Sequence, residues 1–143
     1  MPFERSIGYL VRYAHRAFVK ALASELAPHG VSPAEWAVFR VLWKNDGYSQ
    51  VELARRMRIE KASLTDVLLG MERRGLLKRA RDGKDKRRVV LTLTAKGRAM
   101  RRTLGACATR VNRRATMGID RESVSKLGNL LAQTTANLES EPS

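Results

Sequence analysis

The chain has 143 residues, and its 28 Lys and Arg residues against 14 Asp and Glu residues give a formal net charge of +14. This length fits one domain, whose core need not depend on disulfides or metals. The single cysteine, Cys107, excludes an internal disulfide, and two separated histidines, His15 and His29, are too few for a metal or acid–base site. We therefore expect no cofactor, no bound metal and no enzymatic activity.

The positive charge is concentrated in one block of the chain. Twenty of the 28 basic residues lie between Ala54 and Arg114, a stretch that holds only five acids. A field of one sign on a compact domain indicates a polyanionic partner. The start of the chain lacks the apolar core of a signal peptide, and no run of residues is apolar enough to cross a bilayer. We therefore expect a soluble, cytoplasmic protein without a membrane partner.

The first two helices are marked by apolar spacing and by end signals. From Ile7 onward, apolar residues recur at steps of three and four, which predicts an amphipathic helix that ends near residues 28–30. Residues 32–35 (Ser-Pro-Ala-Glu) then place a serine before the helix, a proline at its first position and a glutamate three residues after the serine. This capping box predicts a second helix over residues 33–44.

Two shorter helices follow. Residues 45–47 (Asn-Asp-Gly) break the chain, and Ser49 and Glu52 repeat the capping box, which predicts a short third helix ending near Met57. The next helix is predicted over residues 60–74. It ends on Gly75, which can adopt the left-handed conformation common at helix C-termini.

The period then changes from helical to extended. Residues 76–81 and 88–93 are β-prone, and residues 82–87 between them carry turn residues and charge, which predicts a hairpin with a basic tip. Thr94 is expected to cap one helix over residues 95–116, which Gly118 closes. A last helix is predicted over residues 120–138, and residues 139–143 are expected to be a flexible tail.

Two short helices followed by a charged hairpin are typical of a winged helix-turn-helix. In that fold the second helix enters the major groove of DNA, and the hairpin reaches along the backbone or into the minor groove. The predicted fold is mainly α with a small β-hairpin wing. All eight aromatic residues precede position 49, so the basic block lacks the stacking groups of RNA and single-strand binders, which favours double-stranded DNA. A basic helical domain with merely solvated charges is the alternative.

Between Ile7 and Met100 the chain resembles the MarR-type transcriptional regulators. The resemblance is strongest over residues 64–79 and over residues 85–97, the strand and turn that form the wing. It implies a single domain of residues 1–143, with a winged helix-turn-helix over 32–94 and dimerisation helices over 1–30 and 95–138. It also implies a homodimer on a palindromic operator, usually a repressor, which a small ligand, a metal or an oxidant releases.

The start of the fourth helix holds the candidates for groove contacts. Lys61, Ser63 and Thr65 offer a cation and two hydroxyls close to the positive end of the helix dipole, where phosphates and base edges would lie. Gln50 matches a family position near the phosphate backbone, although a solvated first-turn residue is an equal alternative. Where many relatives carry arginine this chain has Asp66, which we expect to form an ion pair with Lys61 or Arg73. The alternative is that it accepts a hydrogen bond from cytosine N4.

The wing supplies the remaining DNA candidates. Arg87 matches the family arginine that enters the minor groove, and Asp85 is expected to orient it. Lys84, Lys86 and Arg88 are expected to contact phosphates. The alternative for Arg87 is an exposed arginine without a partner.

The later basic residues are assigned to the dimer stalk. Arg110, Arg113 and Arg114 lie far along the predicted helix 95–116, and we expect them to pair with acids such as Glu122 and Glu139 across an interface. Cys107 stands among small residues, a pattern that indicates close helix packing.

The clustered aromatics suggest an effector pocket between the first two helices. Guanidinium groups at its rim would match a carboxylate, so an aromatic carboxylate or its thioester is the expected effector. The candidate residues are Arg12, Tyr13, Arg16, Trp36, Phe39 and Arg40. Core packing alone is the alternative explanation for the aromatic members of this set.

A rival function stays open from the sequence. A basic protein could coat double-stranded DNA as an architectural component, without an effector and without sequence preference. Competition with nonspecific DNA separates the two functions, because only a regulator keeps its operator complex.

Overall fold

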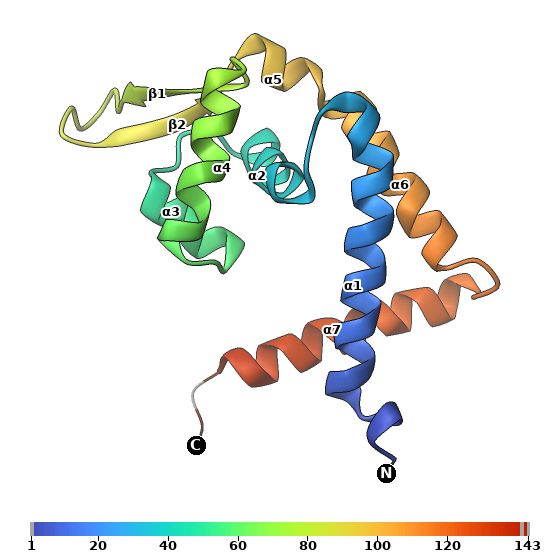
Figure 1. The fold of residues 1–143 in the computed structure, drawn as a ribbon. Helices are drawn as coiled ribbons and strands as arrows, with labels where there is room; N and C mark the ends of the chain where they lie inside the picture. Colours follow the sequence, from blue (N-terminus) through green and yellow to red (C-terminus); the bar gives the residue numbers. More distant parts are fainter. Residues whose placement is uncertain (1, 141, 143) are drawn as a thin grey trace.

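The computed structural model describes residues 2–140 and residue 142, and these form a mainly α-helical chain with one β-hairpin (Figure 1). This confirms the predicted fold class. The elements in chain order are a 3-10 turn at Phe3–Arg5, α1 (Ile7–Leu26), a 3-10 turn at Ala27–His29, α2 (Pro33–Lys44), α3 (Gln50–Met57), α4 (Lys61–Arg73), β1 (Leu77–Arg81), β2 (Val89–Leu93), α5 (Ala95–Ala99), α6 (Arg101–Ala115) and α7 (Arg121–Glu139).

The capping residues identified in the sequence form most of the predicted hydrogen bonds. At α2 the Ser32 hydroxyl accepts from the amide of Glu35 at 3.2 Å, and the Ser32 amide donates to the Glu35 carboxylate at 2.9 Å. Before α2, Gly30 closes the preceding turn with φ at 68°, and after α4 Gly75 does so with φ at 70°. These left-handed conformations are open to glycine at little cost.

The prediction of a second capping box, at Ser49 and Glu52, is wrong for one of its two hydrogen bonds. The Ser49 hydroxyl accepts from the amide of Glu52 at 3.2 Å, as expected for the start of α3. The Glu52 carboxylate does not return to the Ser49 amide. It accepts from the Ser49 hydroxyl at 3.0 Å and pairs with Arg88, because a distant guanidinium competes for the acceptor.

The single helix predicted over residues 95–116 is two helices. Its first turn, α5, ends at Ala99, and α6 begins at Arg101. The carbonyl of Gly97 accepts from the Trp43 indole at 3.1 Å and from the Met100 amide at 3.3 Å. Because these bonds tighten the turn and occupy the carbonyl, the helix is interrupted at Met100.

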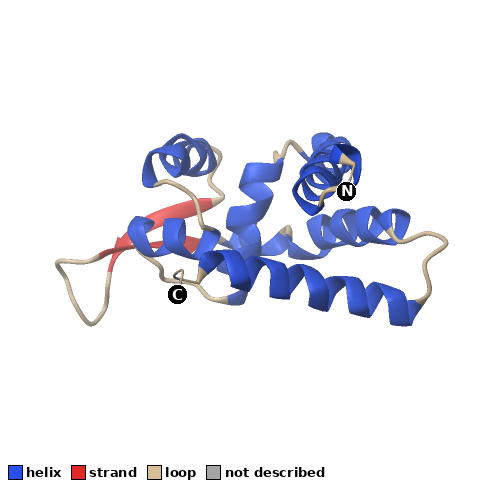
Figure 2. Ribbon diagram, turned by 90° about the horizontal axis from the view of Figure 1, so that it is seen from below, coloured by secondary structure: helices blue, strands red, loops and turns tan. Residues whose placement is uncertain are grey.

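The hairpin is anchored to the helices at its base. β1 and β2 pair antiparallel from Leu77–Leu93 to Arg81–Val89. The loop before α3 pairs with β2 through an isolated antiparallel bridge. The Leu91 amide donates to the carbonyl of Tyr48 at 2.7 Å, and the Leu91 carbonyl accepts from the amide of Gly47 at 3.1 Å. The free end of the hairpin projects away from the helices as a wing (Figure 2).

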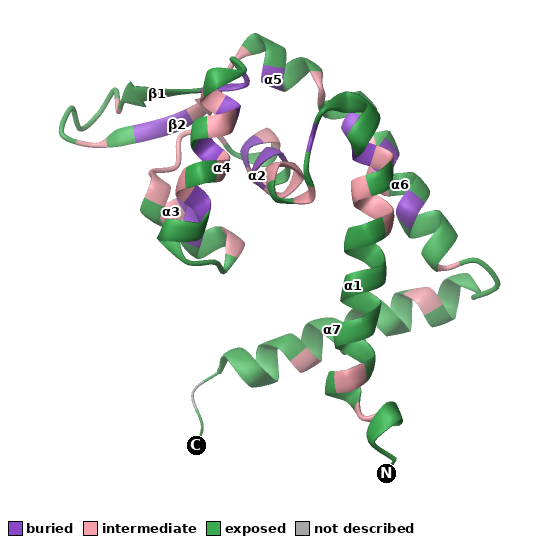
Figure 3. Cartoon of the chain, viewed as in Figure 1, coloured by how far each residue is buried: buried purple, intermediate pink, exposed green. Residues whose placement is uncertain are grey.

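The core lies in the winged helix-turn-helix lobe and continues between α1 and α6 (Figure 3). Its largest fully buried side chains include Phe39, Leu42, Leu53, Leu68 and Leu91. Each such side chain contributes roughly 1.5–3 kcal/mol relative to exposure.

The core does not extend along the first and last helices. Of α1 only Leu26 is buried, and within the described chain α7 buries none of its residues. Among the described residues, no helix combines the length and the apolarity that a membrane crossing requires. Glu139, which the sequence assigned to a flexible tail, is the last residue of α7, and residues 141 and 143 of that tail lie outside the described part of the chain.

Candidate nucleic-acid interface

The start of α4 presents polar groups to solvent. Lys61 and Ser63 are exposed, and Thr65 is half-buried. The residue before the helix, Glu60, makes no side-chain cap, unlike the residues that precede α1, α2, α3, α5 and α7. The first backbone amides of α4 therefore keep donors that a phosphate or a base edge can accept from.

Asp66 does not form the ion pair that was predicted for it. It is exposed on α4, and among the described residues no basic group lies within ion-pair distance of it. Lys61 lies five residues earlier and Arg73 seven residues later. Helical neighbours meet at separations of three and four, so neither position reaches the Asp66 carboxylate.

A network of side chains connects α3, α4 and β1. The Gln50 amide donates to the Thr65 hydroxyl at 2.8 Å, and the Gln50 carbonyl oxygen accepts from Arg79 at 3.3 Å. Arg79 also pairs with Glu72 at 2.8 Å. Thr65 and Gln50, both predicted to contact DNA, therefore already have partners within the protein, and their contacts fix the angle between the two helices.

The tip of the wing carries an almost fully exposed cation. The Arg87 side chain is 94 % exposed, and its Nε lies 3.4 Å from an Asp85 carboxylate oxygen that also accepts from the Arg87 amide at 3.1 Å. Lys84 and Lys86, which precede Arg87 in the loop, are also exposed. The tip therefore presents three cations to the solvent, and Asp85 restricts the orientation of one of them.

Arg88 lies in a different environment from its neighbour. Its half-buried guanidinium pairs with Asp82 at 2.9 Å through Nη1 and with Glu52 through Nη2. The hydrogen bond from Arg88 lowers the pKa of Glu52, and the amide of Lys84 together with Arg88 lowers the pKa of Asp82. Because two carboxylates already occupy the guanidinium, Arg88 anchors the wing to α3, and this geometry does not favour the phosphate contact predicted for it.

The six predicted effector residues do not share one cavity. Phe39 is fully buried and stacks on Trp43, with ring centroids 5.0 Å apart. Trp36 and Arg40 line a hollow of about 470 Å3 between α2 and the start of α6.

The three effector candidates on α1 lie elsewhere. Arg12, Tyr13 and Arg16 are exposed on α1 and do not line that hollow, and the Arg16 guanidinium lies 5.6 Å from the Tyr13 ring centroid. The aromatic residues of α2 serve the core as well as the hollow. The predicted residues therefore do not form one pocket between the first two helices, and of the six only Trp36 and Arg40 line a common hollow.

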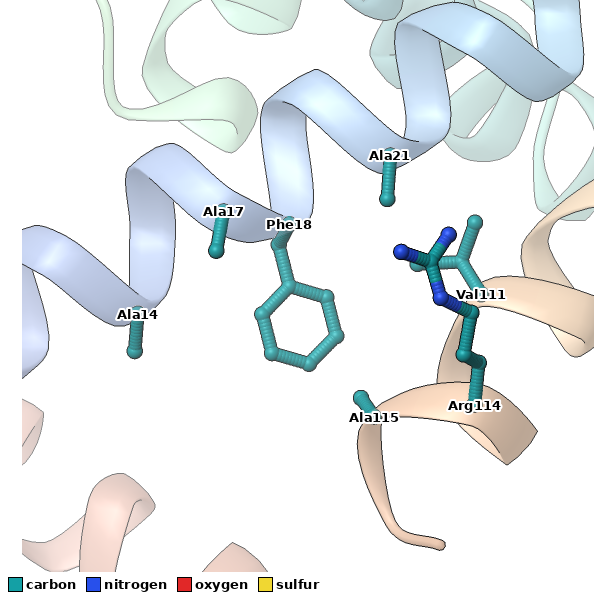
Figure 4. Close-up of a pocket in the computed structure, with 7 residues that line it drawn as sticks. All are labelled: Ala14, Ala17, Phe18, Ala21, Val111, Arg114 and Ala115. Atoms are coloured by element: carbon teal, nitrogen blue, oxygen red, sulfur yellow. The ribbon is translucent and has the colours of Figure 1, made fainter.

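Two hollows lie along α1, and other helices border them. The first, of about 260 Å3, lies between α1 and α6. In it the ring of Phe18 extends beside small alanine side chains and below the guanidinium of Arg114 (Figure 4). A second, of about 490 Å3, lies between α1 and α7 and is lined almost entirely by apolar side chains. The alanines Ala14, Ala17 and Ala21 on one face of α1 are the sequence signal for the first hollow.

One basic residue of the stalk, Arg110, pairs differently from the prediction. Arg110 binds Glu25 of α1 at 2.8 Å, and this carboxylate raises the pKa of Arg110. Glu139 instead pairs with Arg58 at the end of α3, at 2.7 Å. Cys107 is fully buried with its sulfur 3.5 Å from the carbonyl of Glu25, which confirms the predicted close packing of this helix. In the described residues no group of three or more His, Cys, Asp and Glu residues could hold a metal ion.

Comparison with known proteins identifies the family. The MarR family description matches residues 31–89. HTH-type transcriptional regulator TtmR of Methylorubrum extorquens is 35 % identical over 98 residues, which cover 68 % of this chain and 50 % of TtmR. The chain therefore spans about half the length of that relative.

Solved structures match over nearly the whole chain. The transcriptional repressor CouR, solved with a 23-mer DNA duplex, is 31 % identical with a TM-score of 0.81, over 92 % of this chain and 94 % of CouR. BpsR of Bordetella bronchiseptica, whose DNA binding is regulated by 6-hydroxynicotinic acid, is 22 % identical with a TM-score of 0.87, over 99 % of both chains. Because it has the wing and the α3–α4 pair of a winged helix-turn-helix and matches these relatives, the chain belongs to the MarR family of DNA-binding transcriptional regulators.

Proposed function

We propose that this chain is a repressor that binds a palindromic DNA operator as a homodimer and is released by a small effector. The observation that carries the proposal is the contrast at the wing, where Arg87 is free to reach DNA while Arg88 anchors the hairpin to α3. A fixed base with an exposed basic tip suits insertion into the minor groove.

The direct DNA contacts in this proposal come from α4 and the wing. Lys61 and Ser63 meet phosphates and base edges in the major groove, Arg87 enters the minor groove, and Lys84 and Lys86 contact phosphates. Gln50, Thr65 and Arg88 act through position, since each is already bonded within the protein. The complex of CouR with a DNA duplex supports this arrangement.

The homodimer follows from apolar surface that one copy leaves exposed. Leu10, Leu127, Leu130 and Leu131 are each between 45 % and 55 % exposed along the groove between α1 and α7. A contiguous apolar surface of this kind marks a site of protein association. A second copy, related by a two-fold axis, would cover the groove and place two lobes on a palindromic site.

The effector in this proposal is an aromatic carboxylate or its thioester. The chain that binds it is a single domain of residues 1–143, with a winged helix-turn-helix over 32–94 and dimerisation helices over 1–30 and 95–138. BpsR supports an aromatic acid as the class of effector. Trp36 and Trp43 offer ring surfaces and Arg40 a guanidinium in the hollow between α2 and α6.

Competition experiments test the function. DNA from upstream of the gene should form a complex that survives an excess of nonspecific duplex and dissociates on addition of aromatic acids. Loss of the complex under competition alone would favour the architectural DNA-coating protein instead, because non-specific binding is typically about 10³–10⁷ times weaker than operator binding.

A further inference from the structure

A basic hollow opens between the second half of α2 and the end of α3. It encloses about 510 Å3, and its polar lining consists of Arg40, Lys44, Asn45, Tyr48, Arg56 and Arg58. Among the described residues that line it, none is a carboxylate. Four cations around one concave surface create a field that favours an anion.

Two of these cations have no acid to neutralise them. Within residues 2–140, no carboxylate lies within ion-pair distance of Arg40 or Lys44. The acids closest in sequence are engaged elsewhere, since Glu35 pairs with Arg74 and Asp46 with Arg98. The hollow therefore keeps most of its positive charge.

The other two cations are held in place. Arg56 donates from Nε to the Tyr48 hydroxyl at 3.3 Å, and its guanidinium lies 5.6 Å from the centroid of the same ring. Arg58 is bonded to Glu139 at the rim. Because Tyr48 orients Arg56 before binding, this side chain loses less conformational entropy when a ligand arrives.

The hollow is separate from the proposed DNA surface. None of the residues that line it belongs to α4 or to the wing tip at residues 82–88. Arg40 and Lys44 lie one turn apart on the exposed face of α2, whereas Phe39 and Leu42 face the core. These cations are not needed for the contacts assigned to Lys61, Ser63 and Arg87.

A second hollow adjoins the first and adds aromatic surface. It shares Arg40 and Lys44 with the basic hollow, and it is completed by Trp36, Trp43 and Arg101. The two indoles meet edge to face with centroids 5.6 Å apart. Rings in this arrangement leave faces on which a planar ligand group can pack.

We propose that the two hollows form one site for a ligand that joins an aromatic ring to a di- or polyphosphate. The ring packs against Trp36 and Trp43, and the phosphates lie among Arg40, Lys44 and Arg56. Guanidinium and ammonium groups bind phosphate oxygens well, and a cluster of four matches several negative charges better than a single carboxylate. This inference deepens the proposed function, because it names the class of ligand for the hollow assigned there to the aromatic effector. Binding to the free protein is measured without the operator and does not depend on operator recognition.

The pair at the rim connects this site to α7. A phosphate that reaches Arg58 competes with the Glu139 carboxylate, so occupancy of the site weakens the bond between the end of α3 and the end of α7. Both side chains of that pair are substantially exposed, and the competition is therefore modest.

The test measures ATP, inorganic tripolyphosphate and adenosine binding to the free full-length protein, by calorimetry and by tryptophan emission. Both tryptophans of the chain lie at the site, so ATP should change their emission. The double variant Arg40→Gln with Lys44→Gln should bind ATP and tripolyphosphate about tenfold more weakly. The matched control, Lys20→Gln with Arg113→Gln, removes the same charges at exposed positions outside both hollows and should stay within about twofold of the wild type.

A third variant keeps the test decisive if the double variant fails to fold. Glu139→Gln removes the competing carboxylate and should raise the ATP affinity about two- to threefold. Equal losses in the double variant and its control, or no ATP binding to the wild type, would overturn the site without touching the operator-binding proposal. A greater loss of operator affinity in the double variant than in the control, with no ligand present, would show that the hollow is a DNA surface and would also overturn it.

Discussion

At the scale of single residues, two neighbouring arginines of one sequence motif have different environments. Arg87 is almost fully exposed beside Asp85, whereas Arg88 is bound by Asp82 and Glu52. A guanidinium that is already bonded to two carboxylates has little to gain from a phosphate, and a guanidinium in water can bind one. The two residues should therefore respond differently to substitution.

Replacing Arg87 by alanine should lower operator affinity at least about tenfold, because it removes the minor-groove contact and leaves the fold unchanged. Fluorescence anisotropy with labelled operator measures this change. Arg113→Ala, which removes an equal charge from α6, provides the control. Unchanged affinity in Arg87→Ala would contradict the assignment.

The anchor of the wing should weaken in acid. The pKa values of Glu52 and Asp82 lie below their ordinary values, so the stabilisation is complete above those ordinary values and is lost as pH falls through the lowered ones. Glu52→Gln should therefore have a lower Tm than the wild type at pH 7, and this difference should shrink near about pH 3.5. Thermal unfolding at both pH values measures it, and a difference that does not depend on pH would rule out the ion pair as its cause.

At the scale of elements, the junction of α5 and α6 fixes the winged lobe to the stalk. Gly97 is buried there, and an added Cβ would lie 2.2 Å from the carbonyl oxygen of Leu76. The Trp43 indole bonds to the carbonyl of the same glycine. The contact between α5 and the hairpin therefore requires a residue without a side chain.

Gly97→Ala should destabilise the protein by about 2–3 kcal/mol, because the backbone of Leu76 has to move. Gly105 of α6 provides the control, since nothing lies within 4 Å of a Cβ built there. Gly105→Ala should be neutral or stabilising by up to about 1 kcal/mol. Urea unfolding of both variants measures the difference, and equal stabilities would show that the close approach at Gly97 has no energetic cost.

At the scale of the whole molecule, the lobe is packed and the first and last helices are not. The buried side chains gather around α2, α3, α4 and the hairpin, while the apolar faces of α1 and α7 stay open (Figure 3). A single copy of the chain therefore buries the apolar side chains of the lobe but not the apolar faces of α1 and α7. The remaining apolar surface is the strongest argument for a homodimer.

Leu130→Glu should dissociate this dimer, because it places a charge in the apolar groove between α1 and α7. Light scattering after gel filtration should then report a monomer, and operator affinity should fall with it. Met117→Glu adds the same charge at a position that is 76 % exposed and outside the groove, and it should stay dimeric. A monomeric wild type would refute the proposed assembly.

The sequence by itself determined most of the helices, the wing and the family, because these depend on neighbours in the chain. Capping residues at Ser32 and Thr94, glycines at positions 30 and 75 and the alternation of apolar residues act within a few positions. The tip arginine, Arg87, was identified in the same way, from a motif of contiguous residues.

Only the tertiary structure decided the roles that depend on distant partners. Arg88 meets Glu52 across 36 positions and Arg110 meets Glu25 across 85, and no local pattern specifies either pair. The break at Met100 arises because Trp43, 54 positions from Gly97, bonds to the carbonyl of that glycine. The basic hollow likewise combines side chains of α2 and α3 whose directions are set by packing, so their common surface exists only once the core has placed the two helices.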